Sequence, residues 1–365
     1  MYTKWIGILQ KVKLRFAKAS FNVRRWVSND EKLMQLINRN ENDLDVQPRG
    51  ENPKVLGIVW DPCKDTFSLG VRHIFEKAEH VPPTKRNILK SIASVYDPLG
   101  LLQNITISLK ILFQEICISG AGWDEIIINE LQEKWAQIIQ GFKMHEDVEI
   151  KRLYIPKDLT EFVVRVYLHG FADASEIAYG AMIYVKFVTS SGTVGVKLVT
   201  AKSRVVPARK KFTILRTKLL GNFILAKLMT NVRQALKEEL VIDNFLCWSD
   251  SSIALSWIRS YKKELKPFEE NRVVEIRKHA SPLNWFHCRS EENPADIITR
   301  FYVVDDSRHD LYINGPTFLK EINEEQKIEG NDPLKSNIGN GDNQEKEVQV
   351  NDVQIAVKPS VHWTF

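Results

Sequence analysis

Hydrophobic positions change their spacing along the chain and divide it into three regions. In the first region, apolar residues recur every three or four positions after Thr84, whose hydroxyl can cap a helix. Asp97-Pro98-Leu99-Gly100 ends this run, and apolar stretches follow at 101–117 and 124–139. The pattern predicts a mostly helical region over residues 1–158.

The second region, residues 159–320, begins with a different period. Three stretches rich in Val, Tyr, Phe and Ile are separated by Gly or Ser-Gly breaks, which predicts consecutive strands joined by short turns. The expected strands are 162–171, 178–188, 194–205, 245–248 and 285–288, and the expected helices are 213–239, one from 251, 266–279 and 293–300. This order predicts an α+β fold, a mixed sheet with flanking helices.

The third region, residues 321–365, is rich in Asn, Gln, Glu, Asp, Lys and Gly and has no sustained apolar period. Such a segment has too little apolar surface to offset the entropy lost on ordering, so we expect a flexible tail.

Composition limits the class of protein. An apolar fraction of 44% over 365 residues is globular, and the four cysteines have neither disulfide-framework nor zinc-site spacing, which favours a reducing compartment. No apolar run approaches a signal-peptide core or a membrane span, so we expect an intracellular protein without membrane contact, in cytoplasm or nucleus. The formal charge of +5 permits a polyanionic partner without requiring one.

Three aspartates, Asp173, Asp250 and Asp296, stand where a predicted strand ends or a helix begins. Phosphodiester cleavage with two magnesium ions needs several carboxylates that converge from different elements, and such positions supply this convergence. Taken singly, each aspartate reads better as an ordinary turn or helix-capping residue.

Several segments, in their order, resemble motifs of BEL/Pao retrotransposon Pol polyproteins. Those similar to the RNase H domain are Leu-His-Gly-Phe-Ala-Asp-Ala-Ser at 168–175, Ala-Lys-Ser-Arg-Val at 201–205, Trp-Ser-Asp-Ser at 248–251, and Trp-Phe-His through Asn-Pro-Ala-Asp at 285–296. Upstream, segments 21–29, 56–61 and 84–101 resemble the stretch between the polymerase palm and the RNase H domain. The resemblance covers roughly residues 19–319.

The resemblance implies an RNase H-like fold behind a reverse-transcriptase connecting region, with an RNA/DNA hybrid as partner. It also implies two magnesium ions, held by Asp173, Asp250, Asp296 and a glutamate from a motif like Pro-Arg-Leu-Glu-Leu. Here the corresponding segment is Leu-Arg-Thr-Lys-Leu, so Lys218 occupies the glutamate position. Because an ammonium cannot coordinate magnesium, magnesium binding is in doubt, and Lys218 could instead pair with Asp173 and Asp250.

Other parts of a Pol polyprotein are missing from this sequence. No Tyr-x-Asp-Asp polymerase motif occurs, and Asp305-Asp306 lies beyond the RNase H-like segment. By resemblance, protease and integrase domains would flank this stretch, and neither is found. We therefore expect an internal Pol fragment, with the remaining Pol domains as partners in a longer polyprotein.

Basic residues flank the turn into the helix expected at 213–239. They could contact nucleic-acid phosphates, and a solvated basic loop is the alternative. These residues are Lys202, Arg204, Arg209, Lys210 and Lys211.

The resulting functional hypothesis is a Pol-derived RNase H-like protein that binds an RNA/DNA hybrid and cleaves its RNA strand with two metal ions, impaired by Lys218. The alternatives are a non-catalytic nucleic-acid-binding module and a decayed transposon fragment. Glu176 is a possible substitute ligand but reads better as a solvated turn residue, and His287 as a structural histidine at a strand end.

Overall fold

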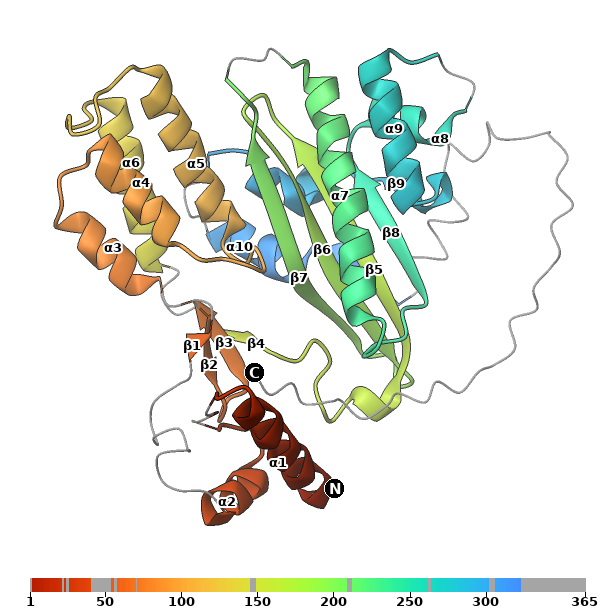
Figure 1. Ribbon diagram of the computed structural model, residues 1–365. Coiled ribbons are helices and arrows are strands. Elements are labelled where there is room, and N and C mark those ends of the chain that lie inside the picture. The colour runs from red at the N-terminus through yellow and green to blue at the C-terminus, as the bar shows by residue number, and fades with distance from the viewer. Residues whose placement is uncertain are drawn as a thin grey trace, which may run out of the picture. The chain divides into compact units, whose positions relative to one another are not determined.

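The computed structural model describes residues 2–21, 23, 26–40, 54–55, 58–69, 71–144, 149–208, 212–261, 264–301 and 306–322. These residues form two compact units. The first holds helices α1 and α2 with strands β1 to β4, and the second holds helices α3 to α6 and all elements from strand β5 onward (Figure 1).

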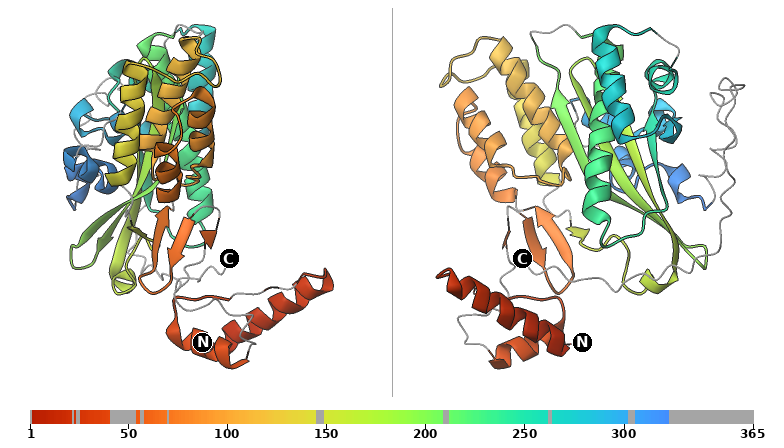
Figure 2. Two further views of the ribbon diagram at one scale, coloured as in Figure 1. Left: turned by 90° about the vertical axis from the view of Figure 1, so that its left-hand side faces the viewer. Right: turned by 45° about the vertical axis from the view of Figure 1, so that its right-hand side comes forward.

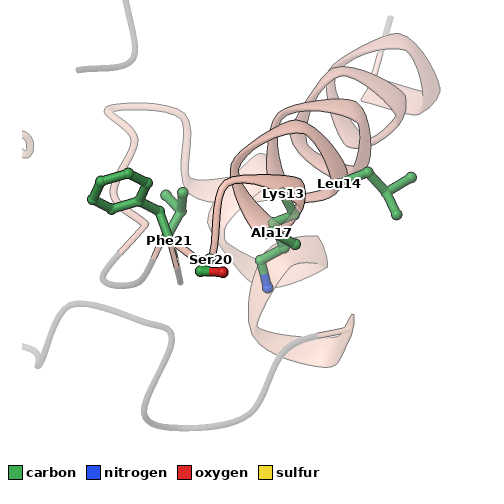
Figure 3. Close-up of a pocket in the computed structure, with 6 residues that line it drawn as sticks. Lys13, Leu14, Ala17, Ser20 and Phe21 are labelled. Atoms are coloured by element: carbon green, nitrogen blue, oxygen red, sulfur yellow. The ribbon is translucent and has the colours of Figure 1, made fainter.

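The first unit contains two helices and a small antiparallel sheet in the order β1-β2-β3-β4. The region was predicted to be mostly helical, and this sheet was missed because its strands are two to four residues long, too short to show an alternating pattern. A shallow apolar hollow lies beside α1, lined by Leu14, Ala17 and Phe21 among others (Figure 3). The elements are α1 (Tyr2–Lys18), α2 (Glu31–Asn40), β1 (Lys54–Val55), β2 (Ile58–Asp61), β3 (Thr66–Leu69) and β4 (Glu149–Lys151).

Four helices open the second unit, and their ends follow the sequence signals. The Thr84 hydroxyl accepts from the Asn87 backbone N–H at 3.2 Å and caps the second of them, as predicted. The Asp97 carboxylate accepts from the backbone N–H groups of Leu101 and Leu102, so the segment that ends this helix also starts the next. The helices are α3 (Arg72–Glu79), α4 (Lys85–Ser94), α5 (Gln103–Ile118) and α6 (Glu130–Met144).

A five-stranded sheet in the order β7-β6-β5-β8-β9 forms the centre of the second unit. The first three strands pair antiparallel through tight turns, whereas β8 and β9 join parallel to β5 and to each other. This is the predicted mixed sheet. Its strands are β5 (Val163–Ala174), β6 (Ala178–Thr189), β7 (Val194–Val205), β8 (Asn244–Ser249) and β9 (Trp285–His287).

Helices cover both faces of this sheet. Helices α7, α8 and α9 lie on one face, and α10 with short 3₁₀ turns lies on the other (Figures 1 and 2). Gly170 lets α7 approach closely, because a Cβ there would lie 2.4 Å from the Leu225 side chain. The main helices are α7 (Ile214–Leu236), α8 (Ser252–Arg259), α9 (Pro267–His279) and α10 (Asp306–Asn314), and the 3₁₀ turns are η2 (Thr160–Phe162), η3 (Pro282–Asn284), η4 (Ser290–Glu292), η5 (Pro294–Ile298) and η6 (Thr317–Lys320).

One helix prediction was wrong. The expected helix at 293–300 is the 3₁₀ turn η5, five residues long. Thr299 ends it, because its hydroxyl and its backbone N–H both bond back to the Asp296 carbonyl, three residues earlier.

The edge of β7 is covered by the loop before α5. The Ala201 N–H donates to the Leu99 carbonyl at 3.1 Å, and the Ser203 N–H and hydroxyl donate to Gln103 Oε1 at 3.1 and 2.7 Å. Gly100, with φ +74°, is required here, since a Cβ would lie 1.8 Å from the Ala201 carbonyl oxygen. Residues 72–144 therefore share one compact unit with the sheet, and a separate domain ending at residue 158 remains a prediction.

No helix in the described part of the chain is both long and apolar enough to cross a membrane. Residues 323–365, most of the predicted tail, lie outside the described residues.

Candidate active site with an internal ion pair

Two of the candidate aspartates stand at the ends of neighbouring parallel strands. Ala172 of β5 and Ser249 of β8 are directly in register, and Asp173 and Asp250 follow them. Because the carboxyl ends of parallel strands meet at one edge, the Asp173 and Asp250 side chains converge there. They are only 3% and 8% exposed, respectively.

Helix α7 brings a lysine to the same place. A Cβ at Gly221 would lie 2.7 Å from the Asp173 carbonyl oxygen, so the glycine lets the helix lie directly against β5. Lys218 lies three residues earlier and shares that side of the helix. Thr213 starts α7 as predicted, with its hydroxyl accepting from the Arg216 N–H.

The Lys218 ammonium occupies the space between the two carboxylates. It donates to both carboxylate oxygens of Asp250 at 2.8 and 2.7 Å, and lies 3.4 Å from Asp173 Oδ1. Burial by itself lowers the pKa of Lys218, but the hydrogen bond to Asp250 and the two negative charges outweigh it, so the pKa lies above its ordinary value. The lysine is therefore a fixed cation, and the pairing expected from the sequence is present.

Asp173 is the most strongly perturbed carboxyl group of the site. Burial, followed by the negative charge of Asp250, raises its pKa to about 7, and the positive charge of Lys218 only partly opposes this. The Thr299 hydroxyl donates to Asp173 Oδ2 at 3.2 Å.

The third aspartate lies nearby in η5. The Asn293 side chain caps this turn and donates to the Ala172 carbonyl at 3.0 Å, which ties η5 to the end of β5. The Asp296 carboxylate is 7% exposed and is engaged by two arginines, Arg300 Nε on Oδ1 at 2.7 Å and Arg308 Nη2 on Oδ2 at 2.9 Å.

These residues do not fit a pair of magnesium ions as they stand. Magnesium requires oxygen ligands at near-octahedral positions, and here the carboxylate oxygens of Asp250 and Asp296 are taken by an ammonium and two guanidinium groups. Among the residues that the structure describes, no group of three or more His, Cys, Asp or Glu side chains is placed to hold a metal ion.

Four of the other sequence candidates lie within the described residues. Lys202 and Arg204 are exposed on β7, whereas the candidates Arg209, Lys210 and Lys211 lie outside the described residues. Glu176 is exposed in the turn between β5 and β6, and His287 is exposed at the end of β9.

Sequence reasoning missed the partners of the carboxylates. Arg300 stands four residues after Asp296, a spacing that could have suggested a pair, but nothing near Arg308 signals its contact twelve residues away. The Ser290 hydroxyl, which donates to Asp250 Oδ2 at 3.1 Å, was also missed.

Solved structures resemble parts of the chain at low identity. RNase H1 from the halophilic archaeon Halobacterium salinarum is 12% identical, with 36% of this chain and 91% of that chain covered and a TM-score of 0.22. LC11-RNase H1, solved with an RNA/DNA hybrid, is 14% identical, with 38% and 96% covered and a TM-score of 0.26. The foamy viral protease-reverse transcriptase, solved with dsDNA, is 15% identical, with 57% and 40% covered and a TM-score of 0.20.

Among curated proteins, none matches this sequence. One family matches, described as the Pao retrotransposon-like RNaseH-like domain, over residues 84–251. The matched stretch runs from the cap of α4 to the cap of α8 and contains Asp173, Lys218 and Asp250. The sheet order and the covering helices agree with an α+β RNase H-like fold. Residues 84–251 of this chain therefore match the Pao retrotransposon-like RNaseH-like domain.

Proposed function

We propose that this protein is the RNase H-like part of a BEL/Pao-type Pol polyprotein that binds an RNA/DNA hybrid and has lost efficient two-metal cleavage of the RNA strand. The observation that carries the proposal is the Lys218 ammonium between Asp250 and Asp173. An active relative would hold two magnesium ions with four carboxylates, and here one carboxylate is replaced by a cation.

The size of the electrostatic effect supports a loss of magnesium binding rather than a small decrease in affinity. Two unit charges about 4 Å apart interact by roughly 4 kcal/mol at an effective dielectric near 20, and a dication doubles this. A lysine at position 218 turns attraction into repulsion of that size and also removes a ligand. Asp173, Asp250 and Asp296 remain the carboxylates that would hold metal if this charge were removed.

Two exposed basic residues of β7 support hybrid binding. Asp173, Gly180 and Ser203 form one row across β5, β6 and β7. Neighbouring strands are about 4.8 Å apart and successive side chains alternate between faces, so Lys202 and Arg204, on either side of Ser203, branch about 10 Å from the Asp173 backbone and project from the opposite face of the sheet. A hybrid that lies against this face of the sheet would bring its phosphates to Lys202 and Arg204, and the sequence adds Arg209, Lys210 and Lys211 as candidate contacts.

Binding measured apart from cleavage tests this function. Fluorescence anisotropy of a labelled RNA/DNA hybrid, in EDTA and then in magnesium, should show binding in both, with the RNA intact on a denaturing gel. Loss of affinity in the Lys202→Ala/Arg204→Ala variant would support the named surface. Absence of hybrid binding at low salt would contradict the proposal and favour a decayed fragment.

In this proposal the remaining Pol domains are partners within a longer polyprotein, and the protein acts inside the cell. The 1–158 stretch would be the reverse-transcriptase connecting region and 159–320 the RNase H-like domain.

A further inference from the structure

The third carboxylate of the centre is paired with two cations of its own, whereas the first two share one. Lys218 contacts Asp250 and Asp173, whereas Asp296 has one arginine on each oxygen, Arg300 and Arg308. With both oxygens of Asp296 accepting short charge-assisted hydrogen bonds, neither is open to a metal ion without displacing a guanidinium.

The two arginines are held very differently. The Arg300 side chain is 61% exposed and follows directly on the η5 turn, so it can leave at small cost. Arg308 is 37% exposed and belongs to α10, twelve residues after Asp296. Its position depends on how firmly that helix is attached.

Helix α10 is anchored by Tyr312, which is 2% exposed. The Tyr312 hydroxyl donates to the Gly100 carbonyl at 3.0 Å and accepts from the Gln103 N–H at 3.2 Å, and its own carbonyl accepts from the Tyr184 hydroxyl at 2.7 Å. Arg308 lies one helical turn before this anchor, so its backbone is fixed against the sheet.

The two sets of ion pairs engage different carboxylates, with Lys218 on Asp250 and Asp173 and the two arginines on Asp296. The Thr299 hydroxyl lies between them, with its single proton shared between Asp173 Oδ2 at 3.2 Å and the Asp296 carbonyl at 3.0 Å. A cation position shared by residue 218, Asp173 and Asp250 is therefore distinct from one shared by Asp173 and Asp296.

We infer that Arg308, supported by Arg300, is a second lock on the carboxylate centre: its ion pair with Asp296 keeps a metal ion off that carboxylate, independently of Lys218. Restoring a glutamate at position 218 then returns one divalent-cation position, and the second appears only when Arg308 also loses its charge. This inference rests on the proposed function and deepens it, because it names what closes the other half of the same site.

Calorimetric titration with magnesium alone tests the inference on four full-length proteins: the parent, Lys218→Glu, Lys218→Glu/Arg308→Leu, and the control Lys218→Glu/Arg289→Leu. Arg289 is exposed, so its removal changes the net charge equally while leaving the Asp296 pair intact. We expect one ion bound by Lys218→Glu and by the control. The Arg308→Leu variant should bind a second ion, with at least about a tenfold gain in affinity for that site.

Thermal melts in EDTA and in magnesium provide a readout that does not depend on catalysis. Removing Arg308 leaves Asp296 buried without its fixed partner, so magnesium should raise the melting temperature of Lys218→Glu/Arg308→Leu more than that of the control. If the leucine variant lacks a cooperative melt, Arg308→Gln removes the charge while keeping more of the side chain.

Two results would overturn separate parts of the account. Two magnesium ions bound by Lys218→Glu alone, unaffected by Arg308→Leu, would overturn the second lock and leave the proposed function standing. Two ions bound tightly by the parent protein would overturn the proposed function itself.

Discussion

The Lys218 ammonium donates hydrogen bonds to both carboxylate oxygens of Asp250, at 2.8 and 2.7 Å. It also lies 3.4 Å from Asp173 Oδ1, so one buried cation neutralises much of the charge of two converging carboxylates. We propose that this pairing stabilises the metal-free fold, at the position where the family resemblance places a fourth carboxylate.

Charge reversal at this position should separate stability from metal binding. With Lys218→Glu, three carboxylates face one another, and breaking a buried ion pair typically costs about 3 to 5 kcal/mol. We expect a lower free energy of unfolding in EDTA, recovered in part by magnesium, and a gain in cleavage. Urea denaturation with and without magnesium measures this. Lys227→Glu, the same change at an exposed position of α7, is the control, and equal stability losses in both variants would contradict the account.

Asp173 should make stability depend on pH in an unusual direction for an aspartate. Burial raises its pKa from 3.8 to about 7, so the folded state keeps a proton that the unfolded chain releases near pH 4. Stability from this group is therefore fully present below about pH 4 and is lost as pH rises toward 7, by at most about 1.4 kcal/mol per pH unit.

Asp173→Asn should remove this dependence, because the amide cannot ionise. Unfolding free energies of the variant and the parent, measured from pH 4.5 to 7.5, should therefore diverge in favour of the variant as pH rises. Asp158→Asn, at an exposed position, is the control and should run parallel to the parent. Parallel curves for Asp173→Asn would count against the raised pKa.

Hybrid binding should depend on salt through Lys202 and Arg204. Each lost phosphate contact should reduce the slope of log affinity against log salt by roughly 0.7 to 0.9. We expect the double alanine variant to lose nearly twice that amount, as measured by anisotropy at several salt concentrations. Lys237→Ala, at the far end of α7, should leave the slope unchanged, and an unaltered slope in the double variant would remove these residues from the interface.

The C-terminal boundary of the fold should lie just after η6. Leu319 is fully buried, and the Phe318 ring lies 5.1 Å from that of Trp248, so a chain ending at Asn314 should lose at least about 3 kcal/mol of stability. From composition, we predict that a chain ending at Ile322 keeps the stability of the full protein and that limited proteolysis yields a similar core. A large loss in the longer truncation would show that the polar tail contributes.

Much of the sheet could be predicted from the sequence because its strands are long. Strands β5, β6 and β7 each have twelve residues, enough for composition and glycine breaks to define them. Strands β1 to β4 have two to four residues and η5 has five, and over such lengths the apolar spacing does not distinguish strand, helix and turn.

In the candidate site, one contact could be predicted from the sequence and another could not. The pairing of Lys218 with Asp173 and Asp250 was expected because a family resemblance placed all three at one centre. The contact of Arg308 with Asp296 depends on where α10 is anchored, through Tyr312 on Gly100 and Gln103, more than two hundred residues away in the sequence. No local pattern around Arg308 contains that information.

Magnesium-dependent cleavage by the unmodified protein is the most direct measure of the central claim. A uniformly labelled RNA/DNA hybrid, incubated with the purified full chain and increasing magnesium, should remain intact, while Lys218→Glu in the same preparation should produce at least weak cleavage of the RNA strand. Strong magnesium-dependent cleavage by the unmodified protein, abolished by Asp250→Asn, would show that the centre works with its lysine in place and would contradict the account.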